Sequence, residues 1–299
     1  MFCAQINIKI IKFLKLIKST YLLFFAYILN WIIAEDRLIL KQANILESKI
    51  INGESIRFIE GDVIFKKGNL IIKCQKGQYF EKKGQAVLYN EVTAIKDEFT
   101  FVADTLKFYS NSNQLLGIGE SHTWTPSYDL KADTIRVFTE LDSGIALKDV
   151  VLIKNQQKIK SDKIMYKNYP TLKKLSYSAV GSVEIKDSTI SSESDTANYN
   201  GINESTILKG NPKIFDQSRV LLGDKIKLYY SGNNLEKIYI PSNASSIIIK
   251  TGLIKIGVDS LKNISLKDKI EGKELFGSFS NGKLAVSYTH LTLPTMFEV

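Results

Sequence analysis

The chain has 299 residues, of which 44% are hydrophobic and 10% aromatic, so it is long enough and apolar enough to bury a large core. Its net charge is +9 at pH 7, and four of its lysines (Lys9, Lys12, Lys15 and Lys18) precede the first acidic residue, Glu35. Subtracting these four from the 40 basic residues leaves 36 against 31 acidic residues, a net charge of +5. This mild, interspersed excess suits an anionic ligand or a membrane surface and excludes the basic stripe of a nucleic-acid-binding protein.

The N-terminal segment has the pattern of an export signal. Its lysines are followed by a mainly apolar run from Tyr21 to Ala34, which is short for a membrane span. We therefore expect residues 1–34 to be a signal peptide cleaved after Ala34. An uncleaved membrane anchor is the alternative, because Ile10–Ile17 is also largely apolar. Removal of the leader removes Cys3 and leaves Cys74 alone, so no intramolecular disulfide is expected.

A repeated motif dominates the rest of the chain: a small residue, then Asp, then apolar residues two and four positions further on. The Asp residues are 29, 29, 33 and 29 positions apart, and they are Asp104, Asp133, Asp162, Asp195 and Asp224. A weaker copy has Gln75 in place of Asp, 29 residues before Asp104. Self-similarity at a fixed period indicates one supersecondary unit stacked several times.

The spacing of two within each unit predicts strands. Upstream of Asp104 the apolar residues lie three and five positions away, whereas downstream they lie two and four positions away. Side chains alternate strictly along a strand, so we expect a bulge or sharp bend at the small-Asp step. The Asp carboxylate would then accept hydrogen bonds from the backbone N–H groups that the bend frees. Five copies indicate a structural role and argue against catalysis.

Turn-forming residues separate the predicted strands. The segments Tyr109–Gln114 and Tyr230–Asn234 are rich in Asn, Ser and Gly, as hairpin loops require. We therefore predict an all-β protein, an antiparallel meander with two strands per unit that runs from about Arg57 to at least Ile249. Little helix is expected after Ala34.

Residues suited to catalysis or metal binding are scarce. His122, beside Trp124, is the one histidine before the C-terminal segment, and Cys74 is the one cysteine after the leader. These two cannot form a structural zinc site, and the sequence contains neither Gly-x-Gly-x-x-Gly nor a phosphate-binding loop. We expect a protein that is not an enzyme and has no metal and no cofactor.

The C-terminal segment departs from the repeat. Residues 286–295 carry no charge and resemble the translated adapter of a sequencing library. We expect residues 286–299 to be a non-native tail that does not pack as a strand of the repeat, and the natural chain to continue beyond Ala285. A genuine polar tail is the alternative.

Several short motifs, together with the export signal, resemble the OstA-like (organic solvent tolerance) family, which includes the LptA-type periplasmic proteins of lipopolysaccharide transport. These motifs are Gly61-Asp-Val63, Ala103-Asp-Thr-Leu106, Ala132-Asp-Thr-Ile135 and Gly181-Ser-Val183. The similarity covers residues 38–284, and we assign the mature domain to residues 35–285. The resemblance implies a repeat-built antiparallel β-jelly-roll, an open twisted V that carries lipid A acyl chains in its apolar interior. It also implies end-to-end assembly in the periplasm.

The apolar positions of the repeat are candidates for lining a lipid groove. Burial of an acyl chain yields about 0.8 kcal/mol per methylene, so a carrier between membranes needs a continuous dry groove. The candidate lining residues are Phe99, Phe101, Leu106, Phe108, Ile135, Val137, Ile164, Tyr166, Ile226 and Leu228. The alternative is that these side chains fill a closed core, and a register slip of one residue would reverse every assignment.

Three further functions are compatible with the sequence. They are the soluble N-terminal part of an outer-membrane lipopolysaccharide translocon, an inner-membrane-anchored relay, and an extracellular β-solenoid that acts on polysaccharide. The last ranks lowest, because the repeated Asp residues are spread out rather than clustered.

The edges of a stacked meander are unpaired, so they invite another chain to pair with them. We expect Ile56–Phe65 to form the first edge and a chain ending at Ala285 to self-associate. The complete protein is expected to dock to other lipopolysaccharide-transport β-jelly-roll proteins through its edges.

Overall fold

The computed structural model describes residues 38–216, 219–256, 260–280 and 283–292, and the predicted leader lies outside these ranges. The described chain forms strands and two short 3₁₀ helices, η1 (Ser110–Ser112) and η2 (Pro170–Leu172). The strands are β1 (Ile39–Gln42), β2 (Ile45–Ile51), β3 (Glu54–Lys67), β4 (Leu70–Phe80), β5 (Gln85–Lys96), β6 (Phe99–Tyr109), β7 (Gln114–Thr125), β8 (Tyr128–Phe138), β9 (Ser143–Lys154), β10 (Gln157–Tyr169), β11 (Lys174–Lys186), β12 (Ser191–Asn200), β13 (Ser205–Lys209), β14 (Lys213–Asp216), β15 (Arg219–Leu222), β16 (Lys225–Ser231), β17 (Asn234–Ile240), β18 (Ala244–Ile256), β19 (Ser260–Ser280) and β20 (Lys283–Thr292). None of the described helices is long and apolar enough to cross a membrane.

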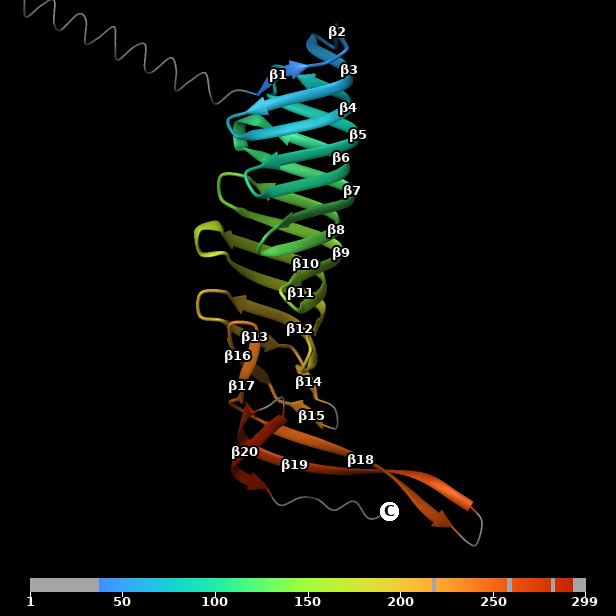
Figure 1. Ribbon diagram of the computed structural model, residues 1–299, viewed down its shortest axis with the longest axis vertical. Helices are drawn as coiled ribbons and strands as arrows, with labels where there is room; N and C mark the ends of the chain where they lie inside the picture. The colour runs from blue at the N-terminus through green and yellow to red at the C-terminus, as the bar shows by residue number, and fades with distance from the viewer. Residues whose placement is uncertain (1–37, 217–218, 257–259, 281–282, 293–299) are drawn as a thin grey trace, which may run out of the picture.

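Strands β3 to β12 form an antiparallel meander in which each strand pairs with the next along the chain. β1 and β2 pair with the other edge of β3. Figure 1 shows the result, an elongated column whose strands run across its long axis. The predicted all-β, repeat-built antiparallel fold is confirmed.

The strands of the meander bend near their middle, at β-bulges of one repeated design. In β7 two consecutive residues, Gly119 and Glu120, have left-handed backbone angles, with φ of 77° and 35°. They lie opposite one residue of β8, Asp133, and the pairing register shifts there. The equivalent pairs are Gly61–Asp62, Asn90–Glu91, Lys148–Asp149, Gly181–Ser182 and Gly210–Asn211. The bend predicted at the small-Asp step is present, but the extra residue belongs to the strand next to the Asp.

The repeated Asp side chains lean over glycines of these bulges. A Cβ atom added to Gly119 would lie 2.3 Å from Oδ2 of Asp104, and the Asp162–Gly181 and Asp195–Gly210 pairs would each give 2.2 Å. Within residues 38–216, the carboxylates of the first four repeated Asp residues accept no hydrogen bond. The prediction that these carboxylates accept hydrogen bonds from backbone N–H groups is therefore wrong for these four residues. At the fifth repeat, Asp224 instead accepts hydrogen bonds from the Ser242 hydroxyl at 3.1 Å and the Asn243 amide at 2.8 Å.

The bends fold the sheet over its own core. On β6, Phe101 and Ala103 are buried before the bend, and Leu106 and Phe108 are buried after it, which is the predicted change of phase. The two halves of the sheet touch: a Cβ atom on Gly117 of β7 would lie 2.5 Å from Cζ of Phe101. One contiguous hydrophobic cluster therefore fills the column from β3 to β19.

Beyond β12 the two halves of the sheet are built from separate strands. β12 pairs with β13 along its C-terminal half and with β14 along its N-terminal half. β16 continues the first half and β15 the second. β19 joins both halves by pairing with β17 and β18, and the β18–β19 hairpin projects from this end of the column (Figure 1).

Two expectations about the ends of the sheet are wrong. Ile56–Phe65 is not a free edge, because β1 and β2 cover β3 along this stretch. Residues 286–292 do pack as part of a strand: they belong to β20, and Val286 lies opposite Gly277 of β19. An unpaired strand edge offers backbone hydrogen-bonding groups to almost any strand-forming sequence, and residues 286–292 include Val, Tyr and two Thr, which favour strands. Residues 293–299 lie outside the described chain.

Candidate functional site

Two rows of hairpin turns meet along one side of the column, because each strand bends at its middle and brings both its ends to the same side. Row A comprises residues 68–69, 97–98, 126–127, 155–156 and 187–190, and row B comprises residues 81–84, 110–113, 139–142, 170–173 and 201–204. We call the line where the rows meet the mouth. Turns of this side are visible at the left of Figure 1.

Lysines at the ends of two strands reach across the mouth. Lys67, the last residue of β3, donates a hydrogen bond to the carbonyl oxygen of Ser110 in row B at 2.8 Å. Lys96, the last residue of β5, donates to the carbonyl oxygen of Thr139 at 3.0 Å and to the Glu140 carboxylate at 3.3 Å. We call these contacts latches. They hold the two rows together at successive levels of the column.

A pocket of about 270 Å³ opens at the mouth next to the Lys96 latch. Its apolar wall consists of Phe99, Tyr128, Val137 and Tyr166, which belong to both halves of the folded sheet. Its rim carries charges of both signs, from Lys96, Asp97, Glu98, Asp142 and Lys173. The pocket is therefore a place where the interior of the column reaches the surface.

The predicted groove residues all point into the column, most of them below its surface. Nine of the ten are buried and Phe99 is half-buried. Of the ten, Phe99, Val137 and Tyr166 line the pocket, and the other seven pack beneath it or further along the core: Phe101, Leu106, Phe108, Ile135, Ile164, Ile226 and Leu228. Their contact with lipid stays a prediction.

A cluster of tyrosines begins at the pocket wall with Tyr128 and Tyr166 and continues in the core to Tyr177 and Tyr199. Of these four, only Tyr166 is among the candidates predicted from the sequence. The ring centroids of Tyr128 and Tyr166 are 5.2 Å apart, and those of Tyr177 and Tyr199 are 5.3 Å apart. The Lys154 ammonium lies 4.3 Å from the Tyr199 ring centroid, a cation–π contact. The available signal was the recurrence of Tyr at inward positions of the repeat.

Burial shifts the ionisation of this cluster toward neutral forms. It raises the pKa of the Tyr128 and Tyr199 hydroxyls to about 12, and the pKa of the Tyr166 and Tyr177 hydroxyls well above the usual value. It lowers the pKa of the Lys154 ammonium, an effect that the Glu204 carboxylate opposes. This part of the core therefore disfavours charge.

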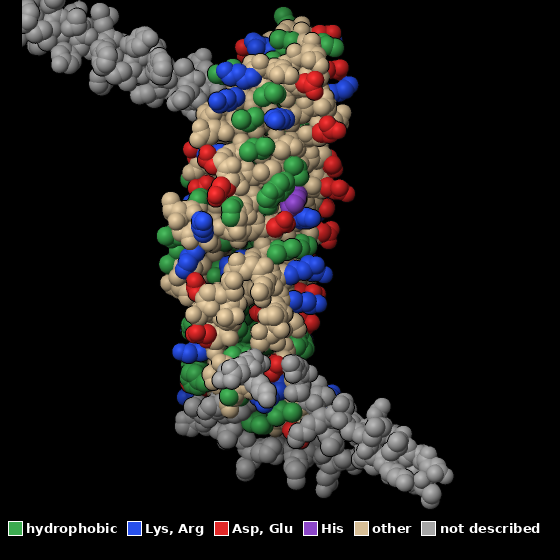
Figure 2. Space-filling model, viewed as in Figure 1, with side chains coloured by type: hydrophobic (Ala, Val, Ile, Leu, Met, Phe, Trp, Pro, Cys, Tyr) green, Lys and Arg blue, Asp and Glu red, His purple; other side chains and the backbone are tan. Residues whose placement is uncertain are grey.

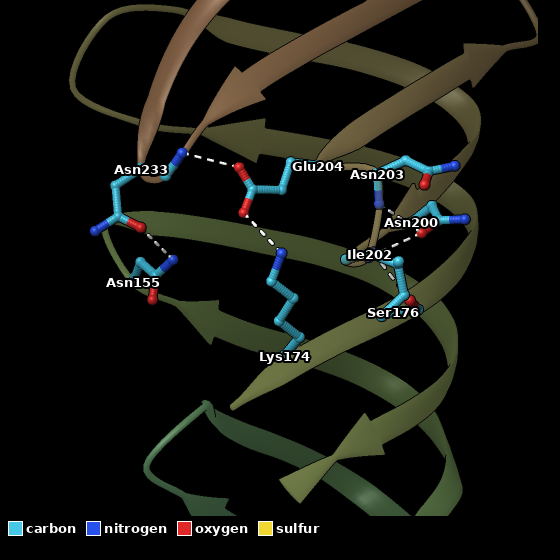
Figure 3. A network of polar contacts seen from close by, with 10 residues as sticks. Asn155, Lys174, Ser176, Asn200, Ile202, Asn203, Glu204 and Asn233 are labelled. Atoms are coloured by element: carbon cyan, nitrogen blue, oxygen red, sulfur yellow. Dashed lines mark hydrogen bonds and ion pairs between the residues drawn. The ribbon is translucent and has the colours of Figure 1, made fainter. Parts of the chain in front are cut away.

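A polar network closes the mouth beside the tyrosine cluster (Figure 3). Lys174 donates to the Glu204 carboxylate at 3.0 Å, and the backbone N–H of Gly232 donates to the other oxygen of that carboxylate at 2.9 Å. Asn155 of row A donates to the side-chain oxygen of Asn233 in the β16–β17 turn. Row A and the opposite half of the sheet are thus joined at this level too.

The remaining candidate residues show no catalytic arrangement. His122 Nε2 lies 3.0 Å from Asp129 Oδ2, and the His122 ring packs on Trp124 at 4.6 Å between centroids. Cys74 is a buried free thiol, and burial raises its pKa to about 11. Across the described ranges, no group of three or more His, Cys, Asp and Glu side chains could hold a metal ion. Figure 2 shows surface charges of both signs, with acidic side chains numerous along one long edge.

Comparison with known proteins gives one family and a distant structural neighbour. Residues 42–233 match the family described as LptA/(LptD N-terminal domain) LPS transport protein. Among solved structures, the chain is similar to LptH, the LptA homologous periplasmic component of the lipopolysaccharide transport device of Pseudomonas aeruginosa. The identity is 11% and the TM-score 0.33, over 46% of this chain and 93% of the LptH chain. A search of the curated proteins found no match.

Proposed function

This chain belongs to the LptA/LptD N-terminal domain family of lipopolysaccharide transport proteins, and from that premise we propose that it carries the acyl chains of a lipopolysaccharide through the periplasm. The interior of the β-jelly-roll takes up the acyl chains, while the sugars stay in water. The protein acts by binding, without a catalytic group or a cofactor.

The observation that carries this proposal is the apolar column that reaches the surface at the mouth. Its buried side chains run without interruption from β3 to β19. Phe99, Val137 and Tyr166 extend it into the pocket between the two rows of turns. A lipid that enters there meets apolar surface in both directions along the column.

Energetics favour entry into this interior over exposure to water. The core is filled, so the rows must separate locally to admit a lipid, and the latches of Lys67 and Lys96 oppose that separation at their levels. A hydrogen bond to a charged group contributes about 1.5–3 kcal/mol. An acyl chain gains about 0.8 kcal/mol per buried methylene, on the order of 10 kcal/mol for one chain, and its atoms replace the core contacts that opening removes.

We further propose that units join end to end through strand edges. Among the described residues, β2 pairs with β3 alone, so its other edge is free there. Its Ile45, Leu46 and Ile50 side chains are 51%, 53% and 81% exposed. Another strand pairing with β2 would cover these side chains and satisfy its backbone groups. The same pairing serves a free-standing periplasmic bridge, a membrane-anchored relay or the soluble part of an outer-membrane translocon.

Photo-crosslinking tests the carrier proposal. Val137 points into the pocket and is 4% exposed, whereas the neighbouring Arg136 points outward and hydrogen-bonds to Gln114 at 3.0 Å. A photoreactive residue at position 137 should label purified lipopolysaccharide, and the same residue at position 136 should not. Equal labelling from both positions would contradict an interior site.

A further inference from the structure

The two latches lie 29 residues apart, which is the period of the repeat. Continuing this period along the chain identifies a position at which the lysine of the latch is missing. Lys67, Lys96, Thr125 and Lys154 are the last residues of β3, β5, β7 and β9, and they are 29 positions apart. The acceptors Ser110 and Thr139 have their counterpart in Asn168, also 29 positions on. One backbone contact marks all three acceptors as equivalent: their N–H groups donate to the carbonyl of residue 84, 113 or 142, at 2.8, 3.0 and 2.7 Å.

At the third of these positions, Thr125 stands where Lys67 and Lys96 stand at the first two. Its side chain is too short to reach row B. The Thr125 hydroxyl instead accepts a hydrogen bond from the Ser127 N–H at 3.1 Å. Within residues 38–216, no hydrogen bond crosses the mouth from Thr125, Pro126 or Ser127. The pocket of about 270 Å³ lies at this level, and it is lined by Thr125 on one side and Asn168 on the other.

One buried polar atom in the pocket wall lacks a partner. The Asn168 side-chain oxygen has no hydrogen-bond partner, although this residue is only 8% exposed, and the buried Tyr166 hydroxyl lies beside that of Tyr128. Buried polar atoms are nearly always paired, and an unpaired one is costly. A ligand group that donates a hydrogen bond, such as an amide N–H or a hydroxyl, would satisfy the Asn168 oxygen.

The charges at the rim decide against an anionic group as the occupant. Asp97, Glu98 and Asp142 outnumber Lys96 and Lys173. A phosphate would gain nothing at this rim and would stay in solvent. The wall behind the rim is apolar, so the chemistry suits an acyl chain that carries a neutral amide or hydroxyl near its base.

We infer that the level of Thr125 is a side port in the mouth, through which one acyl chain of the glycolipid enters the column and rests its amide or hydroxyl against Asn168. The inference rests on the proposed carrier function. On one side the Lys96 latch keeps the rows together. On the other side the Lys154–Tyr199 cation–π contact and the Asn155–Asn233 hydrogen bond do so, and the level of Thr125 gives way first. Thr125 therefore determines where the lipid enters.

Replacing the missing lysine tests the port. In the full chain, Thr125→Lys should place an ammonium against the Asn168 carbonyl, as Lys96 does at Thr139. The association rate with fluorescently labelled purified lipopolysaccharide should fall about tenfold, the effect of one charged hydrogen bond. Gln156→Lys, which adds the same charge at an exposed turn position outside the pocket, should bind at the unaltered rate. An unaltered rate for Thr125→Lys, with the thermal melt unchanged, would overturn the port.

Crosslinking provides a second test that does not depend on the folding of Thr125→Lys. Ser127 lies at the port, and Gln156 occupies the equivalent turn position 29 residues later, outside the pocket. A photoreactive residue at Ser127 should label bound lipopolysaccharide strongly, and one at Gln156 weakly. Equal labelling refutes the port and leaves the carrier function standing. A failure of the unaltered chain to bind lipopolysaccharide refutes the carrier function itself.

Discussion

The pairing of Asp104 with Gly119 shows how single residues bend this sheet. The left-handed conformation of Gly119, with φ of 77°, suits a residue without a Cβ atom, and the Asp104 carboxylate occupies the space that a Cβ atom would need. The period of Asp could be predicted from the sequence. The bulge partners could not, because Asn90 and Lys148 take the same left-handed conformation without being glycine.

Gly119→Ala should destabilise the protein by about 1–3 kcal/mol, because the new methyl group is strained by its backbone angle and clashes with Asp104. Urea denaturation measures the loss. The double variant Gly119→Ala with Asp104→Ala should recover part of it, since the clash is removed and the backbone strain remains. Strictly additive losses would show that the two residues do not interact.

The buried tyrosines make the free energy of unfolding fall as pH rises in the alkaline range. The pKa of Tyr177 is raised far above the value of about 10 expected in the unfolded chain. Above that pH the unfolded state releases a proton that the folded state keeps, so the free energy of unfolding falls as pH rises, by about 1.4 kcal/mol per pH unit for each such tyrosine. The stabilisation is complete below pH 10. Denaturation should show no tyrosine-dependent slope at pH 9 and this slope from pH 10 to 11.5, and Tyr177→Phe should lessen it. An identical slope in the variant would contradict the assignment.

At the scale of the element, the positions of the strands and turns can be predicted from the sequence, whereas the partners of the edge strands cannot. Period-two spacing and Asn/Ser/Gly turns predict β6, β8 and β10 because side-chain burial selects one register. Pairing at an edge needs only backbone groups, so sequence patterns do not show that β1 and β2 cover β3 or that β20 pairs with β19. The groove residues were predicted as inward-facing for the first reason. The pocket depends on the missing contact at Thr125. The 29-residue period marks this position, but only the structure shows that Lys67 and Lys96 reach across to row B.

The free edge of β2 should drive self-association. Its exposed Leu46 and Ile50 make the edge apolar. Replacing both with Lys should weaken association in a concentration series, because charged side chains block strand addition. Light scattering or sedimentation provides the measurement. The matched control is Ile118→Lys. Ile118 is 39% exposed but lies in the middle of the meander, so this change should leave association unchanged. A strict monomer at high concentration in the unaltered protein would contradict the edge proposal.

At the scale of the whole molecule, the continuous core and the latched mouth both result from the bend in each strand. The bends bring both ends of each strand to the same side. The mouth, where the two rows of turns meet, therefore closes the core, and it is also where we propose that the core opens. The interior is filled by buried side chains such as Phe101 and Phe108. A lipid inside the column therefore requires the two rows of turns to move apart, whereas a lipid on the outer surface does not.

The distance across the mouth is thus the most direct test of the account. Spin labels at Ser127 in row A and Thr171 in row B report this distance in a Cys3→Ser background, with Cys74 protected by burial. Saturating lipopolysaccharide should lengthen the distance between these labels. A pair within row A, at Ser127 and Gln156, should keep its distance. An unchanged distance across the mouth, with lipopolysaccharide bound, would contradict the claim that its acyl chains occupy the interior.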